Sequence, residues 1–316
     1  MRIKRINQDD IKVSNKAKVK VKTAGNTQVV QFTAGNNKTC SVVNLSKDTY
    51  LDKKTGEVKH KKKSESRYQS PKSVRKSINR LMDLIRCNAT EPAKCKWLSV
   101  TYAETMTDGK RAFLDAKLFL RKLKRYLAKQ IELTIGQKTF KYITVAEPQG
   151  ESHGNSWHLH ILLIFDDTAP FIENDTIAEL WGYGITSTNK VFDGDGLALY
   201  FKVHLSDVEY EDNSDETDNK DIEDIKSNPA IVEKTVDGVT KMFIKGERLK
   251  YYPSGMNLYS SSRGMKKPDI QEMTNAEAME VVANSKLVYR ETYVIGDKGN
   301  GNLVDKRYYQ KSKKTT

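Results

Sequence analysis

The distribution of apolar positions between residues 70 and 206 predicts a core built from both helices and strands. Ser70 and Pro71 are typical of a helix cap and a first helical turn. The apolar residues that follow recur at the spacing of one helical face: Val74, Ile78, Leu81, Met82 and Ile85. Further helices are expected over residues 110–129, 174–181 and 197–204.

Stretches rich in β-forming residues alternate with these helices and are expected to be strands. They cover residues 97–102, 140–146 and 157–165, with a further strand around 185–191. Residues 148–155 contain a proline and two glycines and should form a turn. The strands on either side of this turn should therefore form an antiparallel hairpin. The pattern as a whole predicts an α+β fold.

The segments on either side of this core have weaker patterns. Residues 1–69 are rich in Lys, Asn, Thr and Ser, and we expect a basic, largely flexible N-terminal arm with at most a marginal hairpin over 17–33. The core is expected to cover residues 70–206. Residues 207–228 are expected to be an acidic insert or linker, and residues 229–316 a smaller C-terminal element with a basic tail.

The charge is distributed unevenly along the 316 residues, whose net charge is +13. Residues 1–80 contain 21 Lys and Arg against 6 Asp and Glu, whereas residues 207–226 contain ten Asp and Glu against two Lys. A basic arm followed by basic helices is typical of a protein that binds a polyanion such as nucleic acid.

Membrane insertion and a disulfide framework are not expected. No apolar run approaches the roughly 18–20 residues that cross a membrane, and the basic start is not followed by the apolar region of a signal peptide. Cys40, Cys87 and Cys95 are odd in number and lack a CxxC spacing. These features favour a reducing cytoplasm.

Two histidines stand two residues apart near the start of the most apolar strand. Because side chains alternate along a strand, His158 and His160 should point to the same face. Glu147, at the end of the preceding strand, can lie beside them across the hairpin. Two imidazoles and a carboxylate suit Mg²⁺ or Mn²⁺. Glu151 and His153, nearer the turn, are alternative ligands.

Tyr200 is a candidate nucleophile in the helix expected over residues 197–204. His204 follows four residues later and shares its helical face, whereas Lys202 points elsewhere. Tyrosine attack on a phosphodiester would leave a phosphotyrosine, whose ester retains the energy needed for rejoining. Lys202 and His204 are possible supporting residues.

In this order, the elements resemble the rolling-circle replication initiators of the HUH endonuclease superfamily, of plasmid and phage type. The matching segments are residues 97–102 (Trp-Leu-Ser-Val-Thr-Tyr), 146–149 with 157–160 (Ala-Glu-Pro-Gln and Trp-His-Leu-His), and 197–200 (Leu-Ala-Leu-Tyr). Residues 261–268 also resemble a C-terminal segment that recurs in such proteins. In the usual tyrosine motif, Tyr-x-x-Lys-Tyr, the last two positions are filled here by Val203 and His204.

The resemblance implies an antiparallel sheet of about five strands, flanked by helices and crossed by single-stranded or hairpin origin DNA. It implies that Glu147, His158 and His160 hold Mg²⁺ or Mn²⁺ and that Tyr200 forms a 5′-phosphotyrosine. In a bacterial cytoplasm, a host DNA polymerase would extend the released 3′ hydroxyl. A host helicase would also be a partner, because the chain has no Walker A loop. Basic side chains of two helices are expected to bind DNA phosphates: Arg75, Lys76, Arg80, Arg111, Lys117, Arg121, Lys122, Lys124 and Arg125.

Two other functions remain open from the sequence. A conjugative relaxase or a single-tyrosine HUH transposase would use the same chemistry, although relaxases usually have a third histidine and an N-terminal tyrosine, which are not found at matching places here. A non-enzymatic basic DNA-binding regulator, with structural histidines, would bind duplex DNA and cleave none of it.

Overall fold

The chain forms two compact units, which are described one at a time. A computed structural model describes residues 3–5, 11–35, 42–62, 64–130, 140–150, 154–191, 193–209, 231–236, 239–295 and 301–311. Unit 1 consists of Met1–Lys63 together with Pro268–Thr316, and unit 2 of Ser64–Lys267. Within the described ranges, no helix is both long and apolar enough to cross a membrane.

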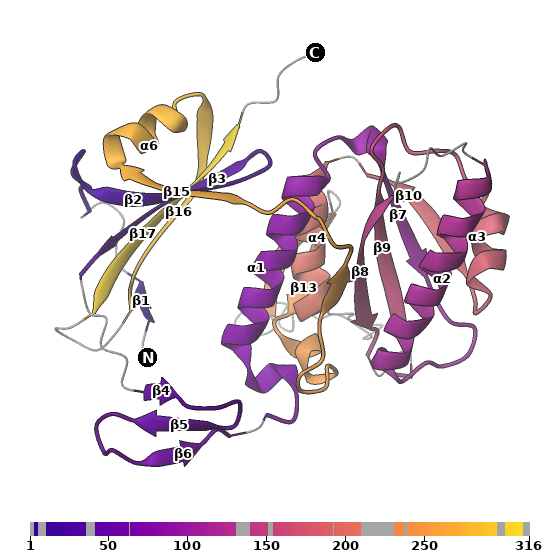
Figure 1. The fold of residues 1–316 in the computed structure, drawn as a ribbon, viewed down its shortest axis with the longest axis horizontal. Helices are drawn as coiled ribbons and strands as arrows, with labels where there is room; N and C mark the ends of the chain where they lie inside the picture. Colours follow the sequence, from indigo (N-terminus) through magenta and orange to yellow (C-terminus); the bar gives the residue numbers. More distant parts are fainter. Residues whose placement is uncertain are drawn as a thin grey trace, which may run out of the picture. The chain divides into compact units, whose positions relative to one another are not determined.

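Unit 2 is built on a five-stranded sheet in which all paired strands are antiparallel (Figure 1). In order across the sheet, the strands are β10 (Thr186–Lys190), β7 (Cys95–Val100), β9 (Trp157–Ile164), β8 (Lys141–Pro148) and β14 (Tyr259–Ser261). The α+β class and the antiparallel five-stranded sheet expected from the sequence are therefore confirmed.

Helices cover both faces of this sheet (Figure 1). On one face lie α1 (Pro71–Asn88) and α4 (Gly194–Ser206), and on the other α2 (Gly109–Gln130) and α3 (Asn174–Trp181). The amphipathic pattern explains this packing, because each helix buries its apolar stripe against the strands. Leu81 and Ile85 of α1, like Leu123 of α2, are fully buried.

After α4, the chain forms a small three-stranded sheet before it returns to the five-stranded sheet as β14. The strands of the small sheet are, in order, β11 (Val208–Glu209), β13 (Val239–Ile244) and β12 (Ile231–Val236). The 3₁₀ turn η5 (Glu247–Lys250) comes next, and Tyr252 then anchors the chain. The Tyr252 hydroxyl donates a 2.9 Å hydrogen bond to the Ala146 carbonyl, and its side chain is fully buried. Short 3₁₀ turns, η2 (Arg67–Gln69) and η3 (Pro92–Lys94), flank α1.

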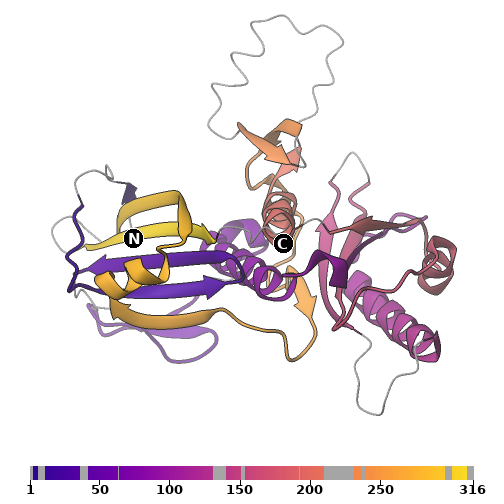
Figure 2. The same ribbon diagram turned by 90° about the horizontal axis from the view of Figure 1, so that it is seen from above.

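Unit 1 contains a six-stranded antiparallel sheet with one helix on it (Figure 2). Its strands are, in order, β1 (Ile3–Arg5), β16 (Ser285–Ile295), β17 (Asn302–Lys311), β3 (Thr27–Ala34), β2 (Lys18–Ala24) and β15 (Asp269–Thr274). Helix α6 (Asn275–Val281) packs on one face through Ala278, against Val19 and Val21. A small sheet of β4 (Val42–Asn44), β5 (Thr49–Asp52) and β6 (Val58–His60) completes the unit.

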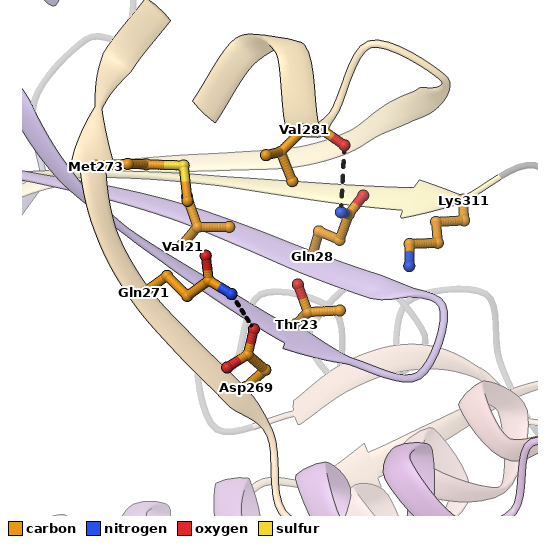
Figure 3. Close-up of a pocket in the computed structure, with 8 residues that line it drawn as sticks. All are labelled: Val21, Thr23, Gln28, Asp269, Gln271, Met273, Val281 and Lys311. Carbon is orange, nitrogen blue, oxygen red and sulfur yellow. Dashed lines mark hydrogen bonds between the residues drawn. The ribbon is translucent and has the colours of Figure 1, made fainter. Parts of the chain in front are cut away.

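A shallow pocket lies on the α6 side of this sheet (Figure 3). The Gln28 side chain donates a hydrogen bond to the Val281 carbonyl, and Gln271 donates one to Asp269. Three of the polar side chains that line the pocket, Gln28, Gln271 and Asp269, thus bond to neighbours within it. Its lining brings together no group of metal-ligating or nucleophilic residues.

The described part of the N-terminal segment differs from the flexible arm expected from the sequence. β2 and β3 form a hairpin, and β3 also pairs with β17 near the other end of the chain. The valines of 17–33 are therefore buried in a core, and this core is completed by residues of α6 and β17 from the far end of the sequence. Residues 210–228, which are most of the expected acidic insert 207–228, lie outside the described residues.

Candidate functional site

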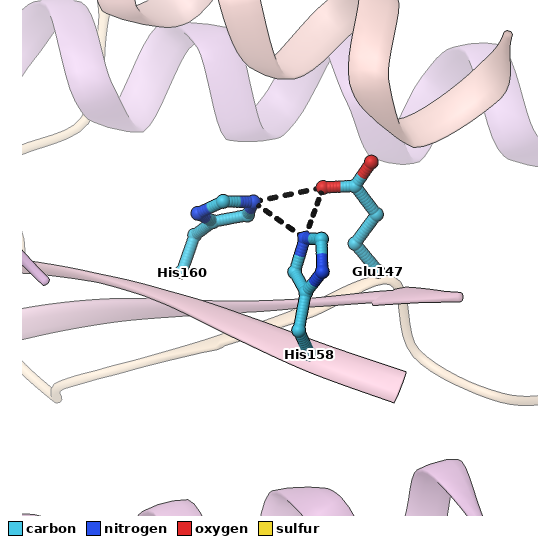
Figure 4. Close-up of side chains that lie close together, drawn as sticks. All are labelled: Glu147, His158 and His160. Atoms are coloured by element: carbon cyan, nitrogen blue, oxygen red, sulfur yellow. Dashed lines mark hydrogen bonds and ion pairs between the residues drawn. The ribbon is translucent and has the colours of Figure 1, made fainter. Parts of the chain in front are cut away.

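The strand register places Glu147 and the two histidines on one face of the unit 2 sheet. In the β8–β9 ladder, Glu147 is directly opposite His158, and Val145 is opposite His160. Directly opposed residues of an antiparallel pair share a face, so the three polar side chains project together towards α1 and α4 (Figure 4). The intervening Leu159 points to the opposite face and is fully buried.

The three side chains converge closely enough to share one cation. Nε2 of His158 and Nε2 of His160 each lie 2.8 Å from Oε2 of Glu147 and 2.9 Å from each other (Figure 4). Neighbouring ligands of an octahedral ion bound at about 2.1 Å stand about 3 Å apart. The donor set of two imidazoles and one carboxylate therefore fits a divalent ion, and these three residues could hold one.

The ring of His160 is oriented from behind by two residues of β7. Its Nδ1 lies 3.0 Å from the Ser99 hydroxyl and 3.3 Å from Nε1 of Trp97. When Nε2 is a metal ligand, Nδ1 carries the proton and needs an acceptor, as ligating histidines commonly do. Ser99 supplies that acceptor; the indole N–H of Trp97 can only donate, so its 3.3 Å hydrogen bond to Nδ1 belongs to the other tautomer, in which Nδ1 is unprotonated.

Burial keeps both imidazoles neutral near pH 7. It lowers the pKa of His158 to about 4. The pKa of His160 is also held well below its usual value, chiefly by burial and additionally by the neighbouring His158 and His204. Glu147 is buried with them. Neutral imidazoles have free lone pairs, so the site can bind a metal ion without first losing protons from the histidines.

The low pKa of His158 gives a testable dependence of stability on pH. In the unfolded chain, His158 has a pKa of about 6.5 and becomes protonated below that pH. In the folded chain, it becomes protonated only near pH 4. The free energy of unfolding should therefore fall as the pH falls from about 6.5 to 4, with about 3 kcal/mol from this residue. Urea unfolding in EDTA measures it. His158→Leu should flatten the dependence, and parallel curves for the two proteins would contradict this pKa.

Helix α4 brings Tyr200 and His204 to the same site. The helix begins after Asp193, whose carboxylate accepts a hydrogen bond from the Gly196 N–H. The Tyr200 ring stacks on His204 with centroids 3.9 Å apart, and it meets the edge of His160 at 6.0 Å. Nδ1 of His204 lies 3.6 Å from Oε1 of Glu147. The structure thus brings together Tyr200, His204 and the three metal-ligand candidates.

Arg248 of η5 belongs to the same cluster, and the sequence did not reveal it. Its Nη1 forms an ion pair with Oε1 of Glu147, and the residue is 8% exposed. Glu147 therefore faces the two β9 histidines with one oxygen and Arg248 and His204 with the other. Nothing in the local pattern around residue 248 marks a functional position, because its partner is about 100 residues earlier in the chain.

The other expected site residues lie elsewhere. Lys202 is exposed on α4, and Glu151 and His153 are outside the described residues. Arg75, Lys76 and Arg80 are exposed on α1, which lies on the same face of the sheet as Glu147. The basic residues of α2 lie on the opposite face, away from the site: Arg111, Lys117, Arg121, Lys122, Lys124 and Arg125. Of these, Lys124 lies over the rings of Phe140 and Tyr142.

Part of the chain is similar to a known protein family. A family model described as replication-associated protein ORF2 matches residues 95–205, about a third of the chain. No curated protein and no solved structure matches. The matched segment begins with β7, includes the β8–β9 hairpin and ends near the end of α4. It therefore contains the Glu-His-His cluster and Tyr200, and its similarity to replication-associated proteins supports a replication initiator.

Proposed function

We propose that this protein is a metal-dependent, strand-specific DNA nicking and joining enzyme of the HUH type that initiates rolling-circle replication of a plasmid, phage or related mobile element. One observation carries the proposal: the Tyr200 ring stands beside a Glu147-His158-His160 cluster, within the segment similar to replication-associated proteins. A tyrosine next to a metal-ligand cluster suits attack on a phosphodiester.

The transfer is balanced without an external co-reactant. The Tyr200 oxygen attacks the phosphorus of the scissile phosphodiester, and the bond from phosphorus to the 3′ oxygen breaks. The proton of the phenol is lost and one is gained by the released 3′ oxygen, so a 5′-phosphotyrosine and a free 3′ hydroxyl result. The reverse attack rejoins the strand. Glu147, His158 and His160 would hold Mg²⁺ or Mn²⁺, which supplies Lewis-acid polarisation of the phosphate.

The surroundings of Tyr200 orient its ring for this step. The ring stacks on His204 on one side and meets the Trp97 indole edge-on at 4.7 Å. Trp97 also contacts His160. One aromatic side chain thus contacts both the proposed nucleophile and a proposed metal ligand, and a fixed separation between the two is what an in-line attack requires.

The charge distribution supports DNA as the substrate. Unit 1 contains 24 Lys and Arg against 12 Asp and Glu, a balance of +12 out of the total of +13. Exposed lysines and arginines attract DNA phosphates and release counterions, so binding should weaken steeply with salt. The origin DNA would be held partly by this unit and by α1, and the host polymerase would extend the free 3′ hydroxyl.

The proposal is tested with a pool of single-stranded oligonucleotides of random sequence, labelled at the 3′ end. Because the 5′ phosphate of the downstream fragment stays on the enzyme, labelled DNA should co-migrate with the protein in a denaturing gel. Mn²⁺ or Mg²⁺ should be required, and EDTA should prevent the adduct. Sequencing the attached strands would give the nick site. Tight binding to duplex DNA without an adduct in either metal would favour a non-enzymatic regulator instead.

A further inference from the structure

We propose that Arg248 is a phosphate-binding residue of the nicking site, supplied by a segment outside the part of the chain that resembles replication-associated proteins. This inference rests on the proposed function. The matched segment 95–205 contributes the nucleophile and the metal ligands, but among the described residues it brings only histidines, and no lysine or arginine, to Glu147. Arg248 is the permanently charged group that reaches this carboxylate.

The position of Arg248 is fixed by the fold on both sides. Before it, Gly246 adopts a left-handed conformation (φ 77°) and donates its N–H to Oδ1 of Asp207 at 2.8 Å. Asp207 is buried and forms the C-cap of α4, the helix that carries Tyr200. After it, Tyr252 is bonded to the carbonyl next to Glu147. The turn is therefore tied both to the tyrosine helix and to the strand that carries the ligand.

The guanidinium has more donors than its surroundings satisfy. Nη1 forms the ion pair with Glu147, but the buried Nε makes no hydrogen bond with any residue that the structure describes. A buried guanidinium with unused donors is expensive for a purely structural ion pair. A phosphate group, with several acceptor oxygens, would satisfy those donors.

The arrangement around Glu147 indicates where that phosphate would lie. The carboxylate presents Oε2 to the two β9 histidines and Oε1 to Arg248 and His204. His204 is also the residue on which Tyr200 stacks. The guanidinium and the proposed nucleophile are thus linked through His204, which lies near Oε1 and stacks on the Tyr200 ring. A phosphate between them would be neutralised by Arg248 as negative charge develops on its oxygens.

If Arg248 binds phosphate, replacing it should change the Mn²⁺ affinity and the rate of nicking in different ways. Arg248 neutralises Glu147 and repels a divalent cation bound to the other carboxylate oxygen, so Arg248→Gln should bind Mn²⁺ as tightly as the wild type or up to about tenfold more tightly. The same variant should lose about 10²- to 10³-fold in the rate of nicking at saturating Mn²⁺, the usual loss when one preorganised donor to a developing oxyanion is removed.

The experiment measures Mn²⁺ affinity by titration calorimetry without DNA, and single-turnover nicking with DNA, for the full chain. Lys250→Gln is the matched control, because it removes an exposed positive charge from the same turn and should change neither quantity. Arg248→Lys keeps the charge without the planar fork and should recover part of the lost rate. If Arg248→Gln does not fold, Arg248→Lys still tests the role, because it retains the positive charge at this position.

Two results would overturn the role of Arg248. Nicking by Arg248→Gln within about twofold of the wild type would show that no phosphate depends on the guanidinium. Parallel loss of Mn²⁺ binding and nicking, without recovery by lysine, would show that Arg248 only holds Glu147 in place. A wild-type protein that forms no adduct would instead contradict the proposed function, so the two failures are distinguishable.

Discussion

Tyr200→Phe should bind single-stranded DNA and Mn²⁺ as the wild type does, yet form no covalent adduct. The substitution removes one oxygen atom and leaves the ring, which stacks on His204 and contacts Trp97, so the packing of α4 is retained. Because the lost atom is the proposed nucleophile, the rate of nicking should fall by at least about 10⁴-fold. Adduct formation in a denaturing gel and DNA binding by fluorescence anisotropy measure the two properties separately.

Tyr289→Phe is the matched control for this substitution. Tyr289 is 51% exposed on β16 of unit 1, and the loss of its hydroxyl should leave the adduct unchanged. An adduct of wild-type yield from Tyr200→Phe would remove Tyr200 from the mechanism. Loss of DNA binding in that variant would show that the hydroxyl serves the substrate complex and not the transfer.

His158→Ala should abolish metal-dependent nicking by removing one of the three ligand candidates. His158 keeps 17% of its side chain exposed, and its ring makes no ion pair other than that with Glu147 among the described residues, so the fold should survive the loss. Changes to groups that merely support a ligand cost about 10- to 100-fold in metal affinity. The loss of a ligand should therefore weaken Mn²⁺ binding by at least about 100-fold.

His60→Ala provides the comparison for this ligand substitution. His60 is exposed on β6 of unit 1, and its removal should alter neither Mn²⁺ affinity nor nicking. Mn²⁺ affinity is measured by calorimetry, and nicking over a range of metal concentrations. If His158→Ala bound Mn²⁺ with unchanged affinity, the ion would have to be held by other residues, and the cluster on β8 and β9 would be structural.

The metal-ligand candidates were predictable from the sequence because their placement depends on local rules. Alternation along one strand put His158 and His160 on the same face, and a hairpin put Glu147 opposite His158. Tyr200 and His204 were linked by the helical spacing of four residues, and the structure stacks their rings. Each of these relations joins residues that are close together in the chain.

The residues and strands that the sequence did not reveal depend on contacts between distant segments. Arg248 meets Glu147 from about 100 residues away, and β14 joins the edge of β8 from a similar distance. The strands β2 and β3 pair with β15 and β17, more than 240 residues later. The alternating valines predicted a marginal hairpin, and the C-terminal helix α6 and strand β17 give its apolar face a core.

The expected DNA-binding surface is also narrowed by the fold. The basic residues of α1 and α2 were indistinguishable in the sequence, because both helices are amphipathic with a basic outer face. The sheet separates them, with α1 on the side of Glu147 and α2 on the other. DNA that reaches Tyr200 would therefore meet α1 before α2. Arg75, Lys76 and Arg80 of α1 are thus better candidates for DNA binding than the basic residues of α2.

The position of the covalent bond tests the central claim most directly. The wild-type protein is incubated with single-stranded DNA and Mn²⁺, the adduct is digested with nuclease and protease, and the modified peptide is identified by mass spectrometry. We expect a nucleotide 5′ phosphate attached to Tyr200, and no modified peptide when EDTA is present. A phosphate attached to any other residue, or an adduct that forms equally in EDTA, would contradict metal-dependent transfer through Tyr200.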